Sequence, residues 1–365
     1  MNEKKTLRVL MMGSNLRAAN GVASFQMNYL RALPREDVHF DFAVLDDIPS
    51  PYEEEIQARG GQIFLLPSLR HPLEHLRKCR EILKNGHYDV VHDNTLMKSL
   101  PLMRAARRAG VPLRILHSHN AQLSENAAKR RLVKRLLPLL KRQCNRYFAC
   151  SALAGECLFG GEDFAFIPNG IHTEDYAFDA TVRAQVRREM GCEDKIVIAT
   201  VARAAAQKNP LFAVDVFEAF LRRHPQAEYW WIGSGTMDDE LAACVARKDL
   251  GGHIRLLGNR SDTPRLYQAM DAFLLPSLFE GLPVTAVEAQ AAGLPCFLSD
   301  AITREAAFSP AVHYLPLTDG PQAWAEAMER WMGDGPRSAP DCAAFNINNC
   351  ARDLALLYRQ ALERR

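Results

Sequence analysis

Several common sequence signatures are missing from this chain of 365 residues, and each absence narrows the choice of function. No apolar run approaches the roughly 20 residues that a membrane-spanning helix needs. The apolar run at residues 9–12 is too short for a signal peptide. The nine cysteines form no C-x-x-C pair, which argues against a zinc site and a disulfide framework. We therefore expect a protein of the reducing cytoplasm.

The chain also has little net charge, because its formal charge is only +2. The charge is unevenly distributed: residues 1–170 hold 25 Lys and Arg against 17 Asp and Glu, and residues 171–365 hold 20 against 26. Hydrophobic content of 48% and charged content of 24% are ordinary for a globular protein. A chain of this length exceeds what one hydrophobic core usually serves, so we expect two domains.

The dinucleotide-binding fingerprint G-x-G-x-x-G is missing as well, although the first segment has a related layout. An apolar run at 7–12 is followed by a loop at 13–21 and a helical pattern at 22–33. No acidic residue stands at the end of a clear second strand to hold a ribose, so a nicotinamide dehydrogenase is disfavoured. Gly21 is the candidate for close approach of the backbone to a ligand. An ordinary strand-to-helix connection explains this loop equally well.

Strand-like and helical segments alternate along the rest of the chain. Such alternation predicts parallel sheets covered by helices on both faces, and hence the α/β fold class. The predicted strands lie at 38–45, 62–66, 89–92, 114–117, 196–201, 227–232, 254–257, 272–275 and 295–298. The predicted helices lie at 52–59, 71–85, 99–109, 129–142, 151–159, 210–223, 322–332 and 346–362, with a kink or break at Pro138.

The segment after the strand 272–275 is the strongest candidate for a binding loop. Gly281 lies in a turn, Pro283 is predicted at the first helical position, and Gly293 stands just past the expected helix end. The segment therefore reads as strand, tight loop and helix start. In a parallel α/β sheet, ligands bind where such loops open at the carboxyl edge of the strands.

Two carboxylates accompany this helix start. The free backbone N–H groups around Val284 and Thr285 favour an anion. Glu280 lies in the loop, and Glu288 lies one to two turns inside the helix. A ligand that carries both phosphate and hydroxyl groups accounts for this combination, whereas two ordinary salt bridges are the alternative.

Two further loops carry polar residues after predicted strands. Arg203 and Lys208 suit a diphosphate, since Arg supplies a planar fork of donors and Lys a point charge. A solvated basic loop is the alternative. Asn259 and Arg260 form a turn before Asp262, which we expect to cap the next helix.

Two histidines mark the end of the strand at 114–117. His117 and His119 would point to opposite faces if the strand continued through both. A histidine after a strand is more often structural than catalytic, but its place at the carboxyl edge of the sheet favours a site. His119 is the preferred candidate and His117 the alternative.

Basic residues and leucines interleave at helical spacing over residues 129–142. A basic amphipathic helix suits an anionic membrane surface. A helix with a buried apolar face and a solvated basic face is the alternative. Aromatic residues are not interleaved with the charge, so we expect no nucleic-acid binding.

The sequence around Glu280 and Glu288, FEGLPVTAVEAQAAGLP, resembles the E-x7-E motif of the retaining glycosyltransferases of family 4. That resemblance implies the GT-B fold, with two Rossmann-like parallel-sheet domains facing across a cleft and the C-terminal helix crossing back to the first domain. The family's I-P-N-G-I element matches residues 167–171 and marks the domain boundary. The expected domains are an acceptor-side domain at 1–170 with helix 346–365, and a nucleotide-sugar-binding domain at 171–345.

The resemblance also implies roles for particular residues. Catalytic roles are expected for His119 near the donor sugar, Glu280 on its hydroxyls, and Arg203 with Lys208 on the diphosphate. One match departs from the family, because Ala202 stands where the family has Gly before the Arg. The remaining expected substrate-binding residues are Gly21, Asn259, Arg260, Gly281, Leu282, Pro283, Val284, Thr285 and Glu288, the last on the ribose.

The function implied is transfer of a sugar from a nucleotide diphosphate sugar to a glycan or polyprenyl-linked acceptor. Similarity to bacterial exopolysaccharide and capsule enzymes favours a UDP-sugar and peripheral contact with the inner face of the membrane. The sequence has no D-x-D motif, and its cations could replace a metal, so we predict metal independence and no cofactor. A sugar-nucleotide epimerase of the same fold and a non-catalytic nucleotide-sugar-binding protein are the alternatives.

Overall fold

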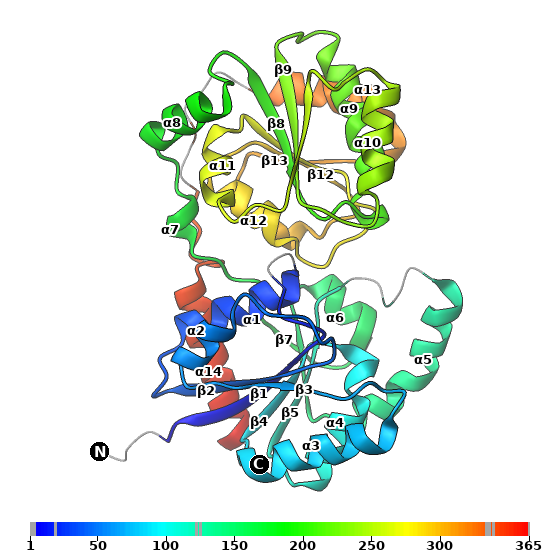
Figure 1. Cartoon of the computed structure of the whole chain (residues 1–365), viewed down its shortest axis with the longest axis vertical. Coiled ribbons are helices and arrows are strands. Elements are labelled where there is room, and N and C mark those ends of the chain that lie inside the picture. Colours follow the sequence, from blue (N-terminus) through cyan, green and yellow to red (C-terminus); the bar gives the residue numbers. More distant parts are fainter. Residues whose placement is uncertain are drawn as a thin grey trace. The chain divides into compact units, whose positions relative to one another are not determined.

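The computed structural model describes residues 5–17, 20–120, 123, 126–332, 337 and 340–363. The chain divides into two compact units, each of which is described by itself (Figure 1). Unit 1 comprises residues 1–170 and 347–365, and unit 2 comprises residues 171–346. Each unit contains one sheet of parallel strands with helices packed against it, so the predicted α/β class is confirmed.

Unit 1 is built on a seven-stranded sheet in the order β3-β2-β1-β4-β5-β6-β7. The strands are β1 (Leu7–Gly13), β2 (Val38–Val44), β3 (Ile63–Leu65), β4 (Val90–Asp93), β5 (Leu113–Ser118), β6 (Arg146–Ala149) and β7 (Ala165–Phe166). The four central strands β2, β1, β4 and β5 are largely apolar and buried, as expected for parallel strands covered on both faces, whereas β3 and β7 at the two edges have no buried residue. Because β1 lies between β2 and β4, the strand order reverses there, and ligands commonly bind at such a point.

The helices of unit 1 cover both faces of this sheet. They are α1 (Gly21–Ala32), α2 (Glu53–Ala58), α3 (Pro72–Gly86), the short η1 (Leu96–Ser99), α4 (Leu100–Arg108), α5 (Ala127–Lys141), α6 (Ala152–Phe159) and α14 (Ile347–Glu363). Helix α5 continues through Pro138, so the predicted break is wrong. Its buried residues Val133, Leu137 and Leu140 lie at helical spacing and hold the helix on the core despite the lost N–H group.

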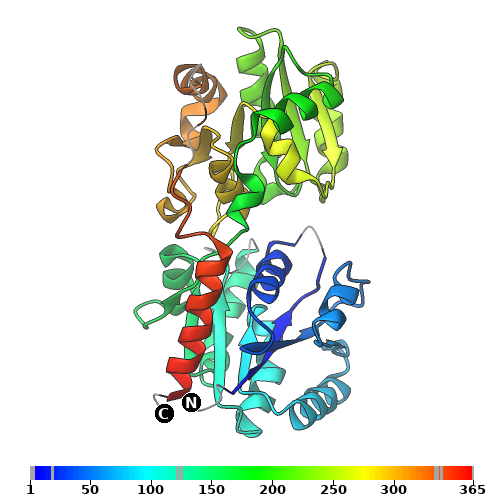
Figure 2. The same ribbon diagram turned by 90° about the vertical axis from the view of Figure 1, so that its left-hand side faces the viewer.

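The last helix, α14, belongs to unit 1 although the whole of unit 2 precedes it in the sequence. It packs against α1 and β5 and runs beside the sheet in both views (Figure 2). Its buried stripe includes Ile347, Leu354 and Tyr358, at the spacing of one helical face. The predicted return of the C-terminal helix to the first domain is thereby confirmed.

Unit 2 is built on a six-stranded sheet in the order β10-β9-β8-β11-β12-β13. Its strands are β8 (Ile196–Val201), β9 (Ala227–Ile232), β10 (Ile254–Gly258), β11 (Ala272–Leu275), β12 (Cys296–Ser299) and β13 (Val312–Leu315). Trp230 and Trp231 are fully buried on opposite faces of β9, so both sides of this sheet are covered. The strand order reverses at β8, which lies between β9 and β11.

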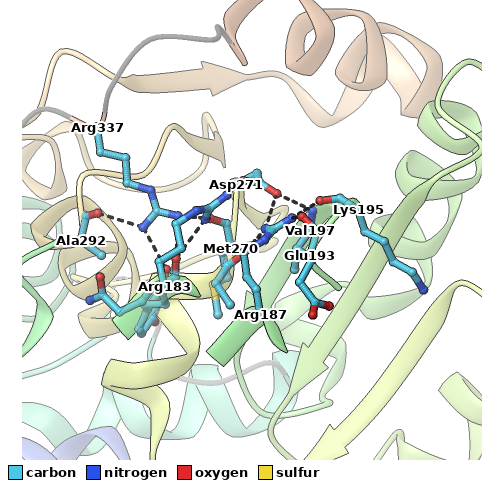
Figure 3. A network of polar contacts seen from close by, with 12 residues as sticks. Arg183, Arg187, Glu193, Lys195, Val197, Met270, Asp271, Ala292 and Arg337 are labelled. Carbon is cyan, nitrogen blue, oxygen red and sulfur yellow. Dashed lines mark hydrogen bonds and ion pairs between the residues drawn. The ribbon is translucent and has the colours of Figure 1, made fainter. Parts of the chain in front are cut away.

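The helices of unit 2 are α7 (Thr173–Tyr176), α8 (Ala180–Met190), η2 (Ala206–Lys208), α9 (Pro210–Leu221), α10 (Asp238–Arg247), α11 (Thr263–Ala269), α12 (Val284–Ala291), η3 (Arg304–Ala306), η4 (Leu317–Asp319) and α13 (Gly320–Trp331). A polar network ties α8 to the start of β11 (Figure 3). The carboxylate of Asp271 accepts hydrogen bonds from Arg183, from Arg187 at 3.1 Å and from the Val197 N–H at 2.7 Å. Because Asp271 directly precedes β11, this network fixes the strand that carries the candidate loop.

Candidate active site

The sequence-predicted residues of unit 2 lie on the segments that follow its strands, at one edge of the sheet. Arg203 and Lys208 follow β8, Asn259 and Arg260 follow β10, and residues 276–283 follow β11. All these strands are parallel, so their carboxyl ends open on the same edge. Strands β8 and β11 are neighbours, which places their two loops at the point where the strand order reverses.

The loops after β8 and β11 are joined by hydrogen bonds around Glu280. The Leu278 N–H donates to the Gln207 carbonyl at 2.8 Å, and the Gln207 amide donates to the Phe279 carbonyl at 2.9 Å. Glu280 is 5% exposed, and its carboxylate forms an ion pair with Lys208. A buried charge is stable only when it is paired in this way.

Two more donors complete the surroundings of the Glu280 carboxylate. Ser277 Oγ donates to Oε1 at 2.8 Å, and the Gln207 amide lies 3.3 Å from Oε2. These contacts hold the carboxylate in one orientation. Glu280 and Lys208, predicted for separate roles, are in direct contact. Ser277 and Gln207, which were not predicted from the sequence, also belong to the site.

The helix after this loop begins with free backbone donors. Pro283 is the N-cap residue, so its prediction as the first helical residue is wrong by one position. The N–H groups of Val284 and Thr285 have no hydrogen-bond partner among the described residues. Gly281 and Leu282, which precede this helix start, are both buried. The start of α12 therefore presents two donors and the positive end of the helix dipole to an anion.

Glu288 lies on α12 between two phenols. Tyr176 donates to Oε1 and Tyr267 donates to Oε2, each at 2.9 Å. Burial raises the pKa of the Glu288 carboxyl above its usual value, and the two phenol hydrogen bonds oppose that shift. The carboxylate keeps further lone pairs, so it can accept hydrogen bonds from ligand hydroxyls while the phenols hold it in place.

Arg203 projects from a loop whose backbone is closely packed. Its side chain is exposed and makes no hydrogen bond or ion pair with any residue that the structure describes. A Cβ on Gly233 would lie 2.2 Å from the Ala202 carbonyl oxygen, and one on Gly235 would lie 2.2 Å from that of Ala204. Both glycines are therefore required for the G-x-G turn after β9 to pass the Arg203 loop.

The turn after β10 contacts the G-x-G turn. Oδ1 of Asn259 accepts a hydrogen bond from the Ser234 N–H at 3.1 Å. Arg260 forms a bidentate pair with Asp262, at 2.8 and 2.6 Å. Asp262 is the N-cap residue of helix α11, as predicted, but its side chain makes no capping hydrogen bond. Its carboxylate binds Arg260 instead, because a guanidinium offers two charge-assisted bonds.

In unit 1, Gly21 is the first residue of α1. A Cβ at this position would meet nothing within 4 Å, so the protein's own packing does not require glycine here. The helix start is instead fixed by Asn20, whose side chain accepts a hydrogen bond from the Val22 N–H at 3.0 Å.

The two predicted histidines lie together. Strand β5 ends at Ser118, and His119 follows it directly. Residues two positions apart in extended backbone point to the same face of a sheet, not to opposite faces. The rings of His117 and His119 stack with centroids 4.0 Å apart, and the expectation of opposite faces is wrong. Phe25 of α1 contacts both rings edge-on, at 5.1 and 5.0 Å.

A third histidine, His92 near the end of β4, belongs to this group, although it was not predicted from the sequence. Its Nε2 lies 2.9 Å from Nδ1 of His117, and its Nδ1 lies 2.7 Å from the hydroxyl of Tyr358. Nε2 of His117 is buried without a hydrogen-bond partner among the described residues. His119 was selected because it follows a predicted strand. His92 ends the predicted strand 89–92, so the same criterion would have selected it as well.

The imidazoles of this cluster are neutral. Desolvation lowers the pKa of both His92 and His119 to about 3, and it lowers the pKa of His117 well below its usual value. Nε2 of His119 lies 2.7 Å from Oδ1 of Asn94, whose amide nitrogen donates to the Met12 carbonyl at 3.1 Å. Nε2 of His119 therefore carries the proton, and Nδ1 presents a lone pair.

The described residues contain neither a candidate metal site nor a membrane-spanning helix. Within the described ranges, no group of three or more His, Cys, Asp or Glu side chains is arranged to hold a metal ion. Among the helices of that same part of the chain, none is both long and apolar enough to cross a bilayer.

Comparison with known proteins identifies the family. The family model described as "Glycosyl transferases group 1" matches residues 182–348, and the model described as "Glycosyltransferase Family 4" matches residues 19–175. EpsF of Bacillus subtilis, a protein named as a glycosyltransferase, is 32% identical over 341 residues, covering 90% of this chain and 88% of its own length.

Two further comparisons agree with this assignment. The UDP-Gal:alpha-D-GlcNAc-diphosphoundecaprenol alpha-1,3-galactosyltransferase of Escherichia coli is 25% identical over 299 residues, covering 77% of this chain and 76% of its own length. The crystal structure of HepE from Anabaena in complex with UDP-glucose aligns with a TM-score of 0.75 and 17% identity over 98% of both chains, which supports the same fold. The chain therefore belongs to the glycosyltransferases of the GT-B fold.

Proposed function

We propose that this glycosyltransferase moves a sugar from a UDP-sugar to a hydroxyl of a glycan or polyprenyl-linked acceptor, with retention of anomeric configuration. In this proposal unit 2 binds the nucleotide sugar and unit 1 provides the acceptor side. The observation that carries the proposal is the arrangement of Arg203, Lys208, Glu280 and the start of α12 on adjacent loops at the reversal point of one sheet. A nucleotide diphosphate sugar carries the phosphates and hydroxyls that such a set binds.

Each part of the donor has a suitable partner in unit 2. The diphosphate suits Arg203, Lys208 and the two free N–H groups of α12. The ribose hydroxyls suit Glu288, which the two phenols orient. Glu280 suits hydroxyls of the donor sugar. Asn259 and Arg260, on the turn after β10, suit the base and the atoms next to it.

Relatives support the choice of UDP and of the acceptor class. HepE was crystallised in complex with UDP-glucose, and the name of the Escherichia coli relative gives a UDP-sugar and a lipid-diphosphate acceptor. The names of further relatives refer to polysaccharide synthesis, among them that of an amylovoran biosynthesis glycosyltransferase of Erwinia amylovora. We therefore assign this chain to exopolysaccharide or capsule synthesis.

The chemistry requires stabilisation of the leaving diphosphate as negative charge develops on it. Preorganised cations and helix N–H groups do this with little reorganisation during the reaction. Lys208 is held in place by Glu280, whereas Arg203 is unpaired in the described structure and is ready to bind an incoming phosphate. Because these cations can supply the charge stabilisation, we propose that transfer proceeds without a metal.

Retention needs either a carboxylate nucleophile or a front-face attack. The carboxylates of Glu280 and Glu288 both accept hydrogen bonds from protein donors, and both are assigned to binding ligand hydroxyls. Neither is therefore assigned as the nucleophile. We therefore favour a front-face route through a short-lived ion pair. His119 of unit 1 contributes a neutral imidazole whose Nδ1 accepts a hydrogen bond from a substrate hydroxyl.

Helix α5 is the proposed site of peripheral membrane contact, within the basic stretch 129–142. Its buried face holds it on unit 1, while Leu132 and Leu139 remain 55% and 44% exposed among basic side chains. Exposed leucines flanked by Lys and Arg suit the surface of an anionic membrane. We therefore propose that the enzyme works in the cytoplasm, at the inner face of the membrane.

The test begins with thermal-shift measurements against UDP, GDP, ADP, dTDP and NAD. A ligand at 100 times its dissociation constant adds about 2.7 kcal/mol of stability. We expect a shift with UDP that is lost in Arg203→Ala and Glu288→Ala and retained in Arg188→Ala, an exposed arginine on α8. Sugar transfer from the matching UDP-sugar to a lipid-diphosphate acceptor is then measured directly.

Other outcomes of this test would point elsewhere. Turnover of the donor without any acceptor would indicate an epimerase, and donor binding without transfer would indicate a non-catalytic binding protein. A shift with NAD alone would refute the proposal.

A further inference from the structure

A cavity lies in unit 1, between helices α3 and α4, which pack side by side (Figure 1). We call it the α3–α4 pocket. Its volume is about 490 Å³, within the range of roughly 300–1,000 Å³ that is typical of small-molecule sites. Residues just before β4 and β5 line it, so it opens at the amino edge of the sheet. The six residues of β5 span roughly 20 Å, which separates the pocket from the histidine cluster at the carboxyl edge.

Four basic side chains surround this pocket without any acidic partner. Arg80 and Lys84 come from α3, and Arg104 and Arg108 come from α4. None of the four forms a hydrogen bond or ion pair with any residue that the structure describes. No Asp or Glu occurs among the residues that line the pocket, all of which are described, and His87 adds a fifth nitrogen-bearing side chain.

The spacing of these residues brings positive charges together on each helix. Arg80 and Lys84 are four residues apart on α3, and Arg104 and Arg108 are four residues apart on α4, so each pair lies on one helical face. Like charges at this spacing repel and destabilise the helix that carries them. The two pairs therefore cost stability that a bound anion would restore.

The dipoles of the two helices do not neutralise the positive charge of these four side chains. The pocket lies at the C-terminal ends of α3 and α4, where each dipole contributes about −0.5 of a charge. Two helix ends together give about −1, against four formal positive charges. A net charge of about +3 remains, which favours a ligand with the charge of a phosphate or diphosphate.

The base of the pocket is apolar. Leu76, Leu83 and Val111 line it, together with the ring of Tyr88. The Tyr88 hydroxyl donates to Asp41 at 2.8 Å, so it is not available to a ligand. Cations at the rim and apolar groups at the base together suit an anion that carries a hydrocarbon part.

Another cavity of unit 1 differs in how its charges are paired. It is lined by Arg8, Arg35, Arg59 and also Glu36, and its guanidinium groups already donate to backbone carbonyls. Its charges are therefore satisfied within the protein, whereas those of the α3–α4 pocket are not.

We propose that the α3–α4 pocket binds a phosphate-bearing anion with an apolar part, at a site separate from the one that binds the donor. Arg80, Lys84, Arg104 and Arg108 hold the phosphate, and the leucines below contact the hydrocarbon. Such a group is available either as a soluble phosphate ester or as the head group of an anionic lipid. This inference stands independently of the proposed donor and acceptor.

The test uses the full chain and soluble dihexanoyl phosphatidic acid as the probe, with amide hydrogen exchange as the readout. We expect protection of peptides from α3 and α4, and at least tenfold weaker binding in Arg80→Gln/Arg104→Gln. Lys84→Gln/Arg108→Gln provides an independent second variant. Arg188→Gln/Arg247→Gln removes two exposed arginines from helices of unit 2 and should bind the probe like wild type. Both pocket variants should keep or raise the melting temperature, because they remove repulsion between like charges.

Sedimentation with lipid vesicles distinguishes the two sources of the phosphate, a soluble ester and the head group of an anionic lipid. Sedimentation with vesicles of phosphatidylglycerol and phosphatidylcholine that falls in both pocket variants, and is unchanged in Arg188→Gln/Arg247→Gln, identifies a lipid head group. Binding of the soluble ester without such sedimentation identifies a free phosphate ester. Wild-type affinity for the ester in both pocket variants, or protection confined to unit 2, would overturn the proposal.

Discussion

Oδ1 of Asn94 accepts a hydrogen bond from Nε2 of His119 at 2.7 Å, and this contact fixes which nitrogen of the imidazole is free. The Asn94 amide cannot turn over without loss of its own hydrogen bond to the Met12 carbonyl. His119 is therefore held in a single tautomer by a residue from the neighbouring strand end. The stacked ring of His117 supports it from one side.

Replacement of Asn94 by Ala should release this constraint. The His119 ring could then rotate and populate both tautomers, so we expect kcat/KM to fall about 10- to 100-fold, the order of loss that follows misplacement of a catalytic group. Steady-state kinetics provide the rate, and the nitrogen chemical shifts of His119 report the tautomer directly. Asn85→Ala, at an exposed position on α3, is the control. Unchanged kcat/KM in Asn94→Ala would show that the tautomer of His119 is irrelevant to transfer.

The phenols around Glu288 should set the pH range of donor binding. Burial raises the pKa of Glu288, and the hydrogen bonds from Tyr176 and Tyr267 lower it. In Tyr267→Phe one lowering contribution is removed, so this pKa rises further. If ribose binding requires the carboxylate, affinity is lost as pH falls through this pKa, and the loss begins at higher pH in the variant.

Dissociation constants for the nucleotide sugar, measured from pH 5 to pH 8, test this shift. The diphosphate of a nucleotide sugar has no ionisation in this interval that would mask it. Tyr52→Phe, in unit 1, should follow the wild-type curve. A midpoint in Tyr267→Phe that is equal to or below that of wild type would contradict the assignment of Glu288.

The glycine at position 235 should be needed for both stability and donor binding. A Cβ there would overlap the Ala204 carbonyl oxygen, and a backbone atom cannot move aside as a flexible side chain could. We expect Gly235→Ala to lower the free energy of unfolding by about 1–3 kcal/mol. Because Ala204 adjoins Arg203, affinity for the diphosphate should fall as well.

Chemical denaturation and donor titration measure these two effects. Gly252→Ala is the matched control, because nothing lies within 4 Å of a Cβ at that position. Stability of Gly235→Ala that matches wild type would mean that the loop after β8 adapts at little cost.

Metal removal should leave transfer unchanged. The charge on the leaving diphosphate is assigned to Arg203, Lys208 and the start of α12, so no divalent ion is required. Initial rates in excess EDTA should equal those in buffer alone, and added magnesium should not increase them. Activity that disappears with chelator and returns with magnesium would show that these cations are not sufficient.

The local sequence was enough to predict the α/β class and most strands and helices, because burial on both faces and helical periodicity are visible over short windows. It also placed Arg203, Lys208 and Glu280 on loops after strands, and Glu288 within the helix that follows. Strand β13 and helix α8 were not predicted. Neither Val312–Leu315, which is only partly buried, nor Ala180–Met190, with few buried residues, has a strong local apolar pattern.

The contacts that give these residues their chemistry were decided by the tertiary structure. Tyr176 reaches Glu288 across 112 positions, Lys208 reaches Glu280 across 72, and Tyr358 reaches His92 across 266. A parallel sheet joins strands that are distant in sequence, so no local pattern reveals which side chains meet at its edge. The sequence alone determined which groups stand at the ends of the strands, while sheet order and helix packing decided their partners, tautomers and pKa values.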